Sequence, residues 1–207
     1  MSIDTLDIQS EEAERIVAVI IQGFAISPVL AVVPFLVIPP AVLPPMTANM
    51  VLAIGSQFYA DFCIKNNLNA FKIMSDLAGF ILRAVIAQAI IGLIPRVGGL
   101  ANALASGVIT QILGWATYLM LRDDMDKRSN LSFFDKVVLL KAAVKKFMDN
   151  REFMNELKKV RSKMSDSDRE LYDRCMKTLT DKNSTPEQRR EALDNGKKIL
   201  ASYELIF

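Results

Sequence analysis

Charged residues are missing from two long stretches in the first half of the chain. No Asp, Glu, Lys or Arg occurs in residues 16–60, and none occurs in residues 97–121. Helices of soluble proteins keep a charged outer face, so such stretches belong either in a membrane or in a deeply buried core. From Arg122 onward, apolar positions recur three or four apart between charged ones. The pattern predicts an all-α protein with apolar helical hairpins, membrane-directed or deeply buried, followed by a small charged helical bundle.

Prolines and capping residues divide the apolar half into predicted elements. A first helix begins at Ser10, and its first turn is acidic, which the positive end of a helix dipole favours. Residues 17–38 form either one proline-kinked spanning helix, about 33 Å long at about 1.5 Å per residue, or two short helices that meet at the prolines. Further helices are predicted over 47–65, 70–94 and 97–121, the last two joined by a turn at 95–99.

The charged half predicts four amphipathic helices. The first carries an apolar stripe that we expect to face the core, formed by Leu131, Phe134, Val138 and Ala142. The last has the clearest start, because Thr185 and Gln188 form a capping box around Pro186. The predicted organisation is an acidic N-terminal tail (1–10), a hydrophobic helical module (11–122), a linker (123–130) and a charged four-helix domain (131–207).

Small or polar residues recur about every four positions in the predicted helix over 97–121. In a membrane, such a face lets helices approach closely and hydrogen-bond, and in an oligomer it would line a pore. The helix-packing or pore-lining candidates are Asn102, Ala103, Ser106, Gly107, Thr110 and Gly114. In a soluble protein, the same face would belong to a buried helix packed against its hairpin partner.

Aromatic and basic residues flank the apolar runs in the arrangement expected at a membrane surface. The membrane-interface candidates are Arg83, Arg96, Trp115, Tyr118 and Arg122. Trp115 and Tyr118 precede Arg122 at the end of the second uncharged run, and Arg96 marks the turn before that run as facing water or lipid headgroups. Arg83 precedes a short apolar segment and would have to snorkel or pair with an acid such as Asp76.

Composition argues against several classes of function. The chain has no histidine, which excludes histidine-dependent triads and imidazole metal sites. Its net charge of +2 is too balanced for a nucleic-acid surface, although 20 of its 25 Lys and Arg residues follow position 121. It contains no phosphate-binding loop, dinucleotide fingerprint, nucleophile elbow or metal-spaced cysteine set. We therefore predict a protein that is not an enzyme and that uses no cofactor and no metal.

Four segments of the apolar half resemble one bacterial family. They are residues 11–17, the proline-rich stretch that ends at Pro45 before Met50, residues 94–98 and residues 102–116. Over residues 11–122 the chain is similar to the GTPase-associated helical family called Domain of Unknown Function 697. Arg96 departs from the small residue expected after the proline of its motif, and the prolines at 39–45 are unusual for it. The resemblance implies a helical module that occurs alone or beside a Ras-like GTPase, and it implies no catalytic residue.

These features together predict a module at the cytoplasmic face of the cytoplasmic membrane that anchors or recruits a partner. The acidic N-terminus carries no secretory signal, so residues 123–207 are expected in the cytoplasm, with Phe153, Leu157 and Tyr172 on the docking surface. The expected partners are membrane lipid, further copies of the chain in a homo-oligomer and a GTPase, with no nucleic acid. Two alternatives stay open: an oligomeric pore-forming protein, and a soluble all-helical protein with a large apolar core.

Overall fold

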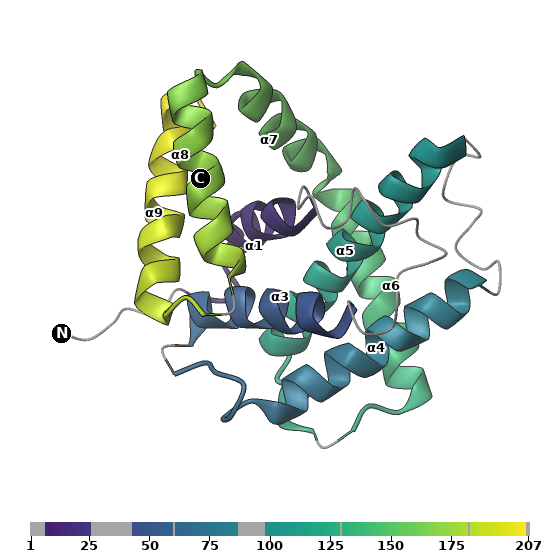
Figure 1. Ribbon diagram of the computed structural model, residues 1–207. Helices are drawn as coiled ribbons and strands as arrows, with labels where there is room; N and C mark the ends of the chain where they lie inside the picture. The colour runs from purple at the N-terminus through teal and green to yellow at the C-terminus, as the bar shows by residue number, and fades with distance from the viewer. Residues whose placement is uncertain are drawn as a thin grey trace.

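The computed structural model describes residues 7–25, 43–59, 61–86, 98–128, 130–181 and 183–205. Every regular element in these ranges is a helix and none is a strand, which confirms the predicted all-α class (Figure 1). The elements are α1 (Glu11–Ala25), α3 (Leu43–Phe58), α4 (Leu68–Ile86), α5 (Gly98–Arg122), the short 3-10 helix η3 (Met125–Lys127), α6 (Phe133–Asp149), α7 (Arg151–Lys163), α8 (Asp166–Thr180) and α9 (Pro186–Ser202).

Local sequence explains where the helices of the apolar half begin. Ser10 caps α1 as predicted, since its hydroxyl accepts a hydrogen bond from the Ala13 amide at 3.1 Å. α3 begins at Leu43, earlier than predicted, and carries Pro44 and Pro45 in its first turn. Prolines are tolerated there because the amides of a first turn have no helical acceptor to lose. α4 and α5 begin within two residues of their predicted starts.

The charged half forms the four predicted helices, α6 to α9. The predicted capping box of α9 is present, with Thr185 and Gln188 bonded to each other's backbone amides and Pro186 in the first turn. A second capping box, formed by Ser132 and Asp135, begins α6. These caps satisfy amides that a helix start leaves without an acceptor, so α6 and α9 begin directly after their capping residues.

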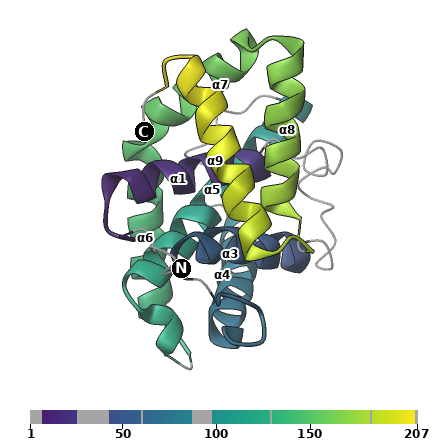
Figure 2. The same ribbon diagram turned by 90° about the vertical axis from the view of Figure 1, so that its left-hand side faces the viewer.

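The long helix α5 runs through the middle of the fold and packs against α1, α3, α4 and α6 (Figure 1). α8 and α9 form a hairpin that lies across α1 and α3, and α7 connects this hairpin to α6 (Figure 2). The charged half therefore surrounds part of the apolar half instead of standing apart from it.

Both halves contribute to one hydrophobic cluster. Side chains from the apolar half, such as Ile20 of α1 and Trp115 of α5, are fully buried, as are Leu179 of α8 and Leu200 of α9. One close approach is at Gly23 of α1, where an added Cβ would lie 3.1 Å from the Met176 sulfur of α8. Close packing across this contact places the predicted hydrophobic module and the predicted four-helix domain in one shared core.

Ion pairs also join the two halves. The acidic first turn of α1, predicted to complement the helix dipole, reaches across to lysines of other helices: Glu12 lies 2.6 Å from Lys197 of α9, and Glu14 contacts Lys146 of α6. Both members of the Glu14 pair are about three-quarters buried, so water screens this pair less than it screens an exposed one. α1 is thereby held by charge at its start and by apolar packing along its length.

The predicted membrane-spanning segments are not confirmed. Of residues 17–38, the part beyond Ala25 lies outside the described residues, as do residues 95–97 of the turn predicted at 95–99, whose last two residues begin α5. Within the described ranges, no helix combines the length and the apolar character that crossing a bilayer requires.

Candidate functional site

The predicted helix-packing positions of α5 are not equivalent. Gly114 faces α1, where an added Cβ would lie 2.3 Å from Cγ1 of Ile21, so this glycine allows the two helices to approach. Gly107 has no described atom within 4 Å of such a Cβ, and Thr110 is buried. The side chains of Asn102, Ala103 and Ser106 lie outside the described part of the chain. Gly114 thus serves packing within one chain.

Two of the membrane-interface candidates lie in the protein core. Trp115 and Tyr118 are fully buried and meet edge to face, with ring centroids 6.0 Å apart. The Tyr118 hydroxyl donates a hydrogen bond to the Ile8 carbonyl at 2.7 Å. Burial raises the pKa of Tyr118 to about 12, and the Glu14 carboxylate adds to the rise. This tyrosine therefore joins α5 to the residues that precede α1.

Of the three basic membrane-interface candidates, the structure describes the side chain of one, Arg122. Arg122 is half-buried, donates two hydrogen bonds to the Asp123 carboxylate at 2.7 and 3.0 Å, and lies 5.9 Å from the centre of the Tyr118 ring. The side chain of Arg83 and the whole of Arg96 lie outside the described residues. Asp76, suggested as a partner for Arg83, lies 3.6 Å from Lys136 of α6. Among the described candidates, none forms a cluster that faces solvent.

The apolar stripe predicted on α6 is wrong in its orientation. Leu131, just before the helix, is buried, but Phe134 is 73% exposed and Val138 is 46% exposed, while Leu139 and Ala143 face the core instead. α6 carries apolar residues on two faces, and α5 covers only one of them. The other face is left in contact with water, which is unusual for two adjacent Phe residues.

We define the α6 face as the exposed side of this helix, formed by Phe133, Phe134, Val138, Lys141, Lys145 and Met148. Apart from Phe133, these positions fall within an arc of about 80° on a helix that turns about 100° per residue. Phe133 is 71% exposed and rests edge-on against Phe80 of α4, with ring centroids 5.5 Å apart. Apolar and lysine side chains therefore share one continuous surface along the helix.

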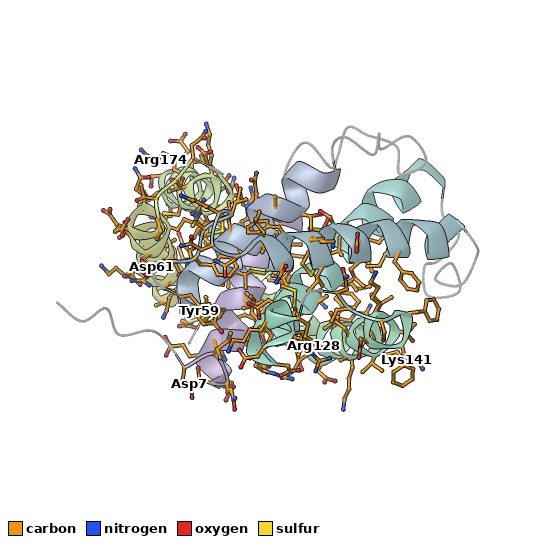
Figure 3. The ribbon with its side chains drawn as sticks, turned by 90° about the horizontal axis from the view of Figure 1, so that it is seen from below. Asp7, Tyr59, Asp61, Arg128, Lys141 and Arg174 are labelled. Atoms are coloured by element: carbon orange, nitrogen blue, oxygen red, sulfur yellow. The ribbon has the colours of Figure 1, made fainter. Side chains whose placement is uncertain are left out.

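The charge of the α6 face is positive. Lys141 and Lys145 lie one turn apart, and Lys141 is on the outer side of the helix (Figure 3). The nearby acids at the start of the helix are engaged: Asp76 pairs with Lys136, and Asp135 accepts hydrogen bonds from Ser132, which lower the pKa of its carboxyl. The exposed Asp149 follows at the far end. The middle of the face thus presents two cations between apolar side chains.

The docking residues suggested for the charged half are not available for docking. Leu157 and Tyr172 are buried, with 2% and 1% of their surface exposed. Phe153 is partly buried, and the guanidinium of Arg15 lies 5.9 Å from the centre of its ring. Helical periodicity identified these residues as apolar positions, but it did not say which partner helix covers them.

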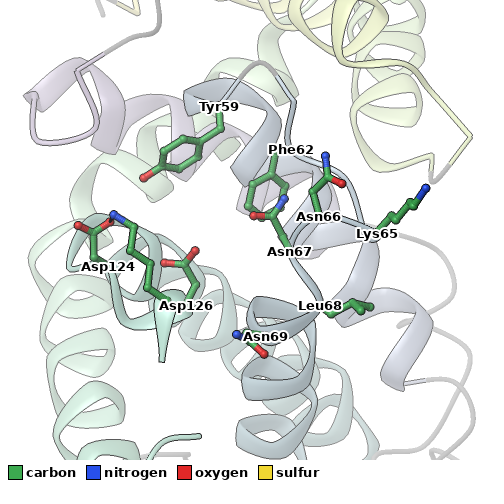
Figure 4. Close-up of a pocket in the computed structure, with 10 residues that line it drawn as sticks. Tyr59, Phe62, Lys65, Asn66, Asn67, Leu68, Asn69, Asp124 and Asp126 are labelled. Atoms are coloured by element: carbon green, nitrogen blue, oxygen red, sulfur yellow. Dashed lines mark ion pairs between the residues drawn. The ribbon is translucent and has the colours of Figure 1, made fainter. Parts of the chain in front are cut away.

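A cavity of about 490 Å³ lies between the loop that follows α3 and the turn at η3 (Figure 4). Its described lining consists of Tyr59, Phe62, Lys65, Asn66, Asn67, Leu68, Asn69, Asp124, Asp126 and Lys127. The Tyr59 hydroxyl donates to the Leu121 carbonyl at 3.4 Å, which ties the loop to the end of α5. No three His, Cys, Asp or Glu side chains of the described ranges come together as metal ligands do.

Sequence reasoning missed both the α6 face and this cavity. A signal for the first was present, because Phe133 and Phe134 are adjacent, and adjacent residues of a helix point about 100° apart, so a helix covered on one side seldom buries both. The cavity had no local signal, since its two walls are far apart in the chain.

Comparison with protein-family models, with curated proteins and with solved structures finds no match for this chain.

Proposed function

We propose that this chain is a non-enzymatic helical module that docks on the cytoplasmic surface of the membrane through the α6 face. The observation that supports the proposal is the exposed combination of two Phe residues with lysines on one side of an amphipathic helix. Helices that lie in a membrane interface have this composition: apolar side chains enter the acyl boundary, and lysines meet anionic headgroups. The ligand that fits this face is therefore an anionic lipid surface.

The binding free energy expected from the α6 face is consistent with reversible docking on a membrane. Burying a Phe side chain contributes about 1.5–3 kcal/mol, and a lysine near an anionic surface adds about 1 kcal/mol. With the lower value for each Phe, the side chains of Phe133, Phe134, Lys141 and Lys145 together supply about 5 kcal/mol, which corresponds to weak binding that a second contact would strengthen. Recruitment of a partner at the membrane would provide such a contact.

We further propose that the recruited partner is a Ras-like GTPase and that the module acts as a homo-oligomer. The support for the GTPase is the sequence resemblance of residues 11–122, and the support for self-association is the gain in membrane affinity that several weak docking faces give together. Mass measurement by light scattering, with and without lipid nanodiscs, tests the second point.

Co-sedimentation with vesicles tests membrane docking. We expect the protein to sediment with vesicles of phosphatidylcholine mixed with phosphatidylserine, and to sediment less with phosphatidylcholine alone. The double variant Phe133→Ser/Phe134→Ser should bind about 100-fold more weakly, because it loses about 3 kcal/mol of apolar transfer. Leu171→Ser is the matched control, since Leu171 is an exposed apolar residue of α8. Equal sedimentation of the double variant and the wild type would contradict the proposal.

The same vesicles, loaded with a self-quenched dye, test the pore-forming alternative. Docking of the α6 face in the interface predicts binding without release of the dye. Dye release that requires binding and increases steeply with protein concentration would instead favour an oligomeric pore.

A further inference from the structure

The cavity beside η3 combines an aromatic wall with the carboxylate of Asp126, which forms no ion pair within the described part of the chain. Figure 4 shows Asp124 and Asp126 on one side, Phe62 and the 65–69 loop on the other, and Tyr59 at the rim. Its volume of about 490 Å³ is within the range of sites that hold small molecules or single side chains. This site is separate from the α6 face and does not depend on membrane docking.

The two acids of the cavity, Asp124 and Asp126, differ in whether they form an ion pair. Asp124 adopts a left-handed backbone conformation with φ 54°, and its carboxylate lies 2.7 Å from the Lys127 ammonium. Asp126 forms no ion pair with any residue of the described ranges. Its partial burial, with Asp124 nearby, raises the pKa of its carboxyl, although the charge of Lys127 acts in the opposite direction, so the charged form is only partly compensated. A ligand cation would supply the missing charge.

The aromatic wall favours a planar cation. Tyr59 and Phe62 stack with their ring centroids 6.1 Å apart and an angle of 28° between the rings, and Tyr59 is 40% exposed while Phe62 is buried. An exposed tyrosine face attracts a cation and stacks best with a flat one. Burial raises the pKa of Tyr59, and the nearby Asp126 and Asp124 carboxylates add to the rise.

The loop opposite the acids supplies amide oxygens. Asn67 donates from Nδ2 to the Cys63 carbonyl at 3.1 Å, which fixes the orientation of its side chain. Asn66 and Asn69 also line the cavity, whereas Lys65 points away from it (Figure 4). A guanidinium has five N–H donors in one plane, more than a carboxylate alone can accept, so neighbouring amide oxygens can accept the remainder.

We propose that this cavity binds a planar guanidinium group, with Asp126 as its carboxylate partner and Tyr59 as its stacking partner. The group belongs either to an arginine side chain on a partner protein or to a small free guanidine compound. Both sources share the chemistry that the cavity recognises, and the experiment below distinguishes them.

Isothermal titration of the full chain tests the proposal with three probes: N-acetyl-argininamide, N-acetyl-lysinamide, and a Gly/Ser peptide with one central Arg. We expect both arginine probes to bind and the lysine probe to bind at least tenfold more weakly. Tighter binding of the peptide than of N-acetyl-argininamide identifies a partner protein as the source, and equal binding identifies the guanidinium alone. Absence of binding by both arginine probes, or equal binding of the lysine probe, would overturn the proposal.

Two variants locate the binding. Asp126→Asn should weaken arginine binding by about 10- to 100-fold, the usual effect of losing a charged hydrogen bond. Asp61→Asn is the control, because Asp61 is an exposed acid of the same loop that is not part of the described lining. Tyr59→Leu should weaken binding independently, and far-ultraviolet circular dichroism checks that each variant is folded. Unchanged affinity in folded Asp126→Asn would show that arginine binds elsewhere.

Discussion

Two glycines of α5 provide a test of the packing between α1 and α5. Both occupy helix positions, where replacement by alanine stabilises by about 0.5–1 kcal/mol because the unfolded chain loses freedom. At Gly107 this gain should appear in full, since no described atom lies within 4 Å of the added Cβ. At Gly114 the Cβ would lie 2.3 Å from Cγ1 and 2.6 Å from Cδ1 of Ile21.

The loss of stability expected for Gly114→Ala follows from the burial of Ile21. Ile21 is completely buried, so it cannot move away without displacing other core side chains. Overpacking of this kind costs about 1–3 kcal/mol, which exceeds the gain in helix propensity. We expect Gly114→Ala to be less stable than Gly107→Ala by about 1–3 kcal/mol.

Urea unfolding followed by far-ultraviolet circular dichroism measures this difference. The two variants should have the same slope of free energy against urea and different midpoints, with the wild type between them. The double variant Gly114→Ala/Ile21→Val would recover part of the loss, because it removes a methyl group from the side chain that obstructs the new Cβ. If Gly114→Ala stabilises the protein as much as Gly107→Ala does, the close approach of α1 and α5 is refuted.

Three further predictions concern caps, charge and pH. Thr185→Ala should lower the free energy of unfolding by about 1 kcal/mol, because it removes the oxygen of the α9 cap, and a stability equal to the wild type would argue against that cap. Glu14→Gln should destabilise the chain, and combining it with Lys146→Met should restore part of the loss, a coupling that a double-mutant cycle in urea measures. Tyr118 binds its proton more tightly in the folded state than in the unfolded state, where the pKa is about 10. Its contribution to the free energy of unfolding is therefore complete below pH 10 and is lost as the pH rises to about 12. The wild type should therefore lose more stability over that pH interval than Tyr118→Phe does, and equal losses would contradict the buried hydroxyl.

The helical class and most helix starts follow from the sequence alone. Ser10, Ser132 and Thr185 cap helices where they stand, because a cap needs only residues within one turn of it. The same local logic explains the first turn of α3, although the prediction began that helix at residue 47. These features depend on neighbours in the chain, so a pattern of polar and apolar residues is enough to find them.

The candidate site depends on contacts between distant residues, and there the sequence was insufficient. Apolar residues lie on two faces of α6, and only the position of α5 decides that Leu139 is buried and Phe134 is exposed. Trp115 and Tyr118 have the sequence pattern of a membrane interface, yet packing against other helices buries them. Periodicity records which residues are apolar, whereas tertiary packing decides which apolar surface meets protein and which one is left for water or a partner.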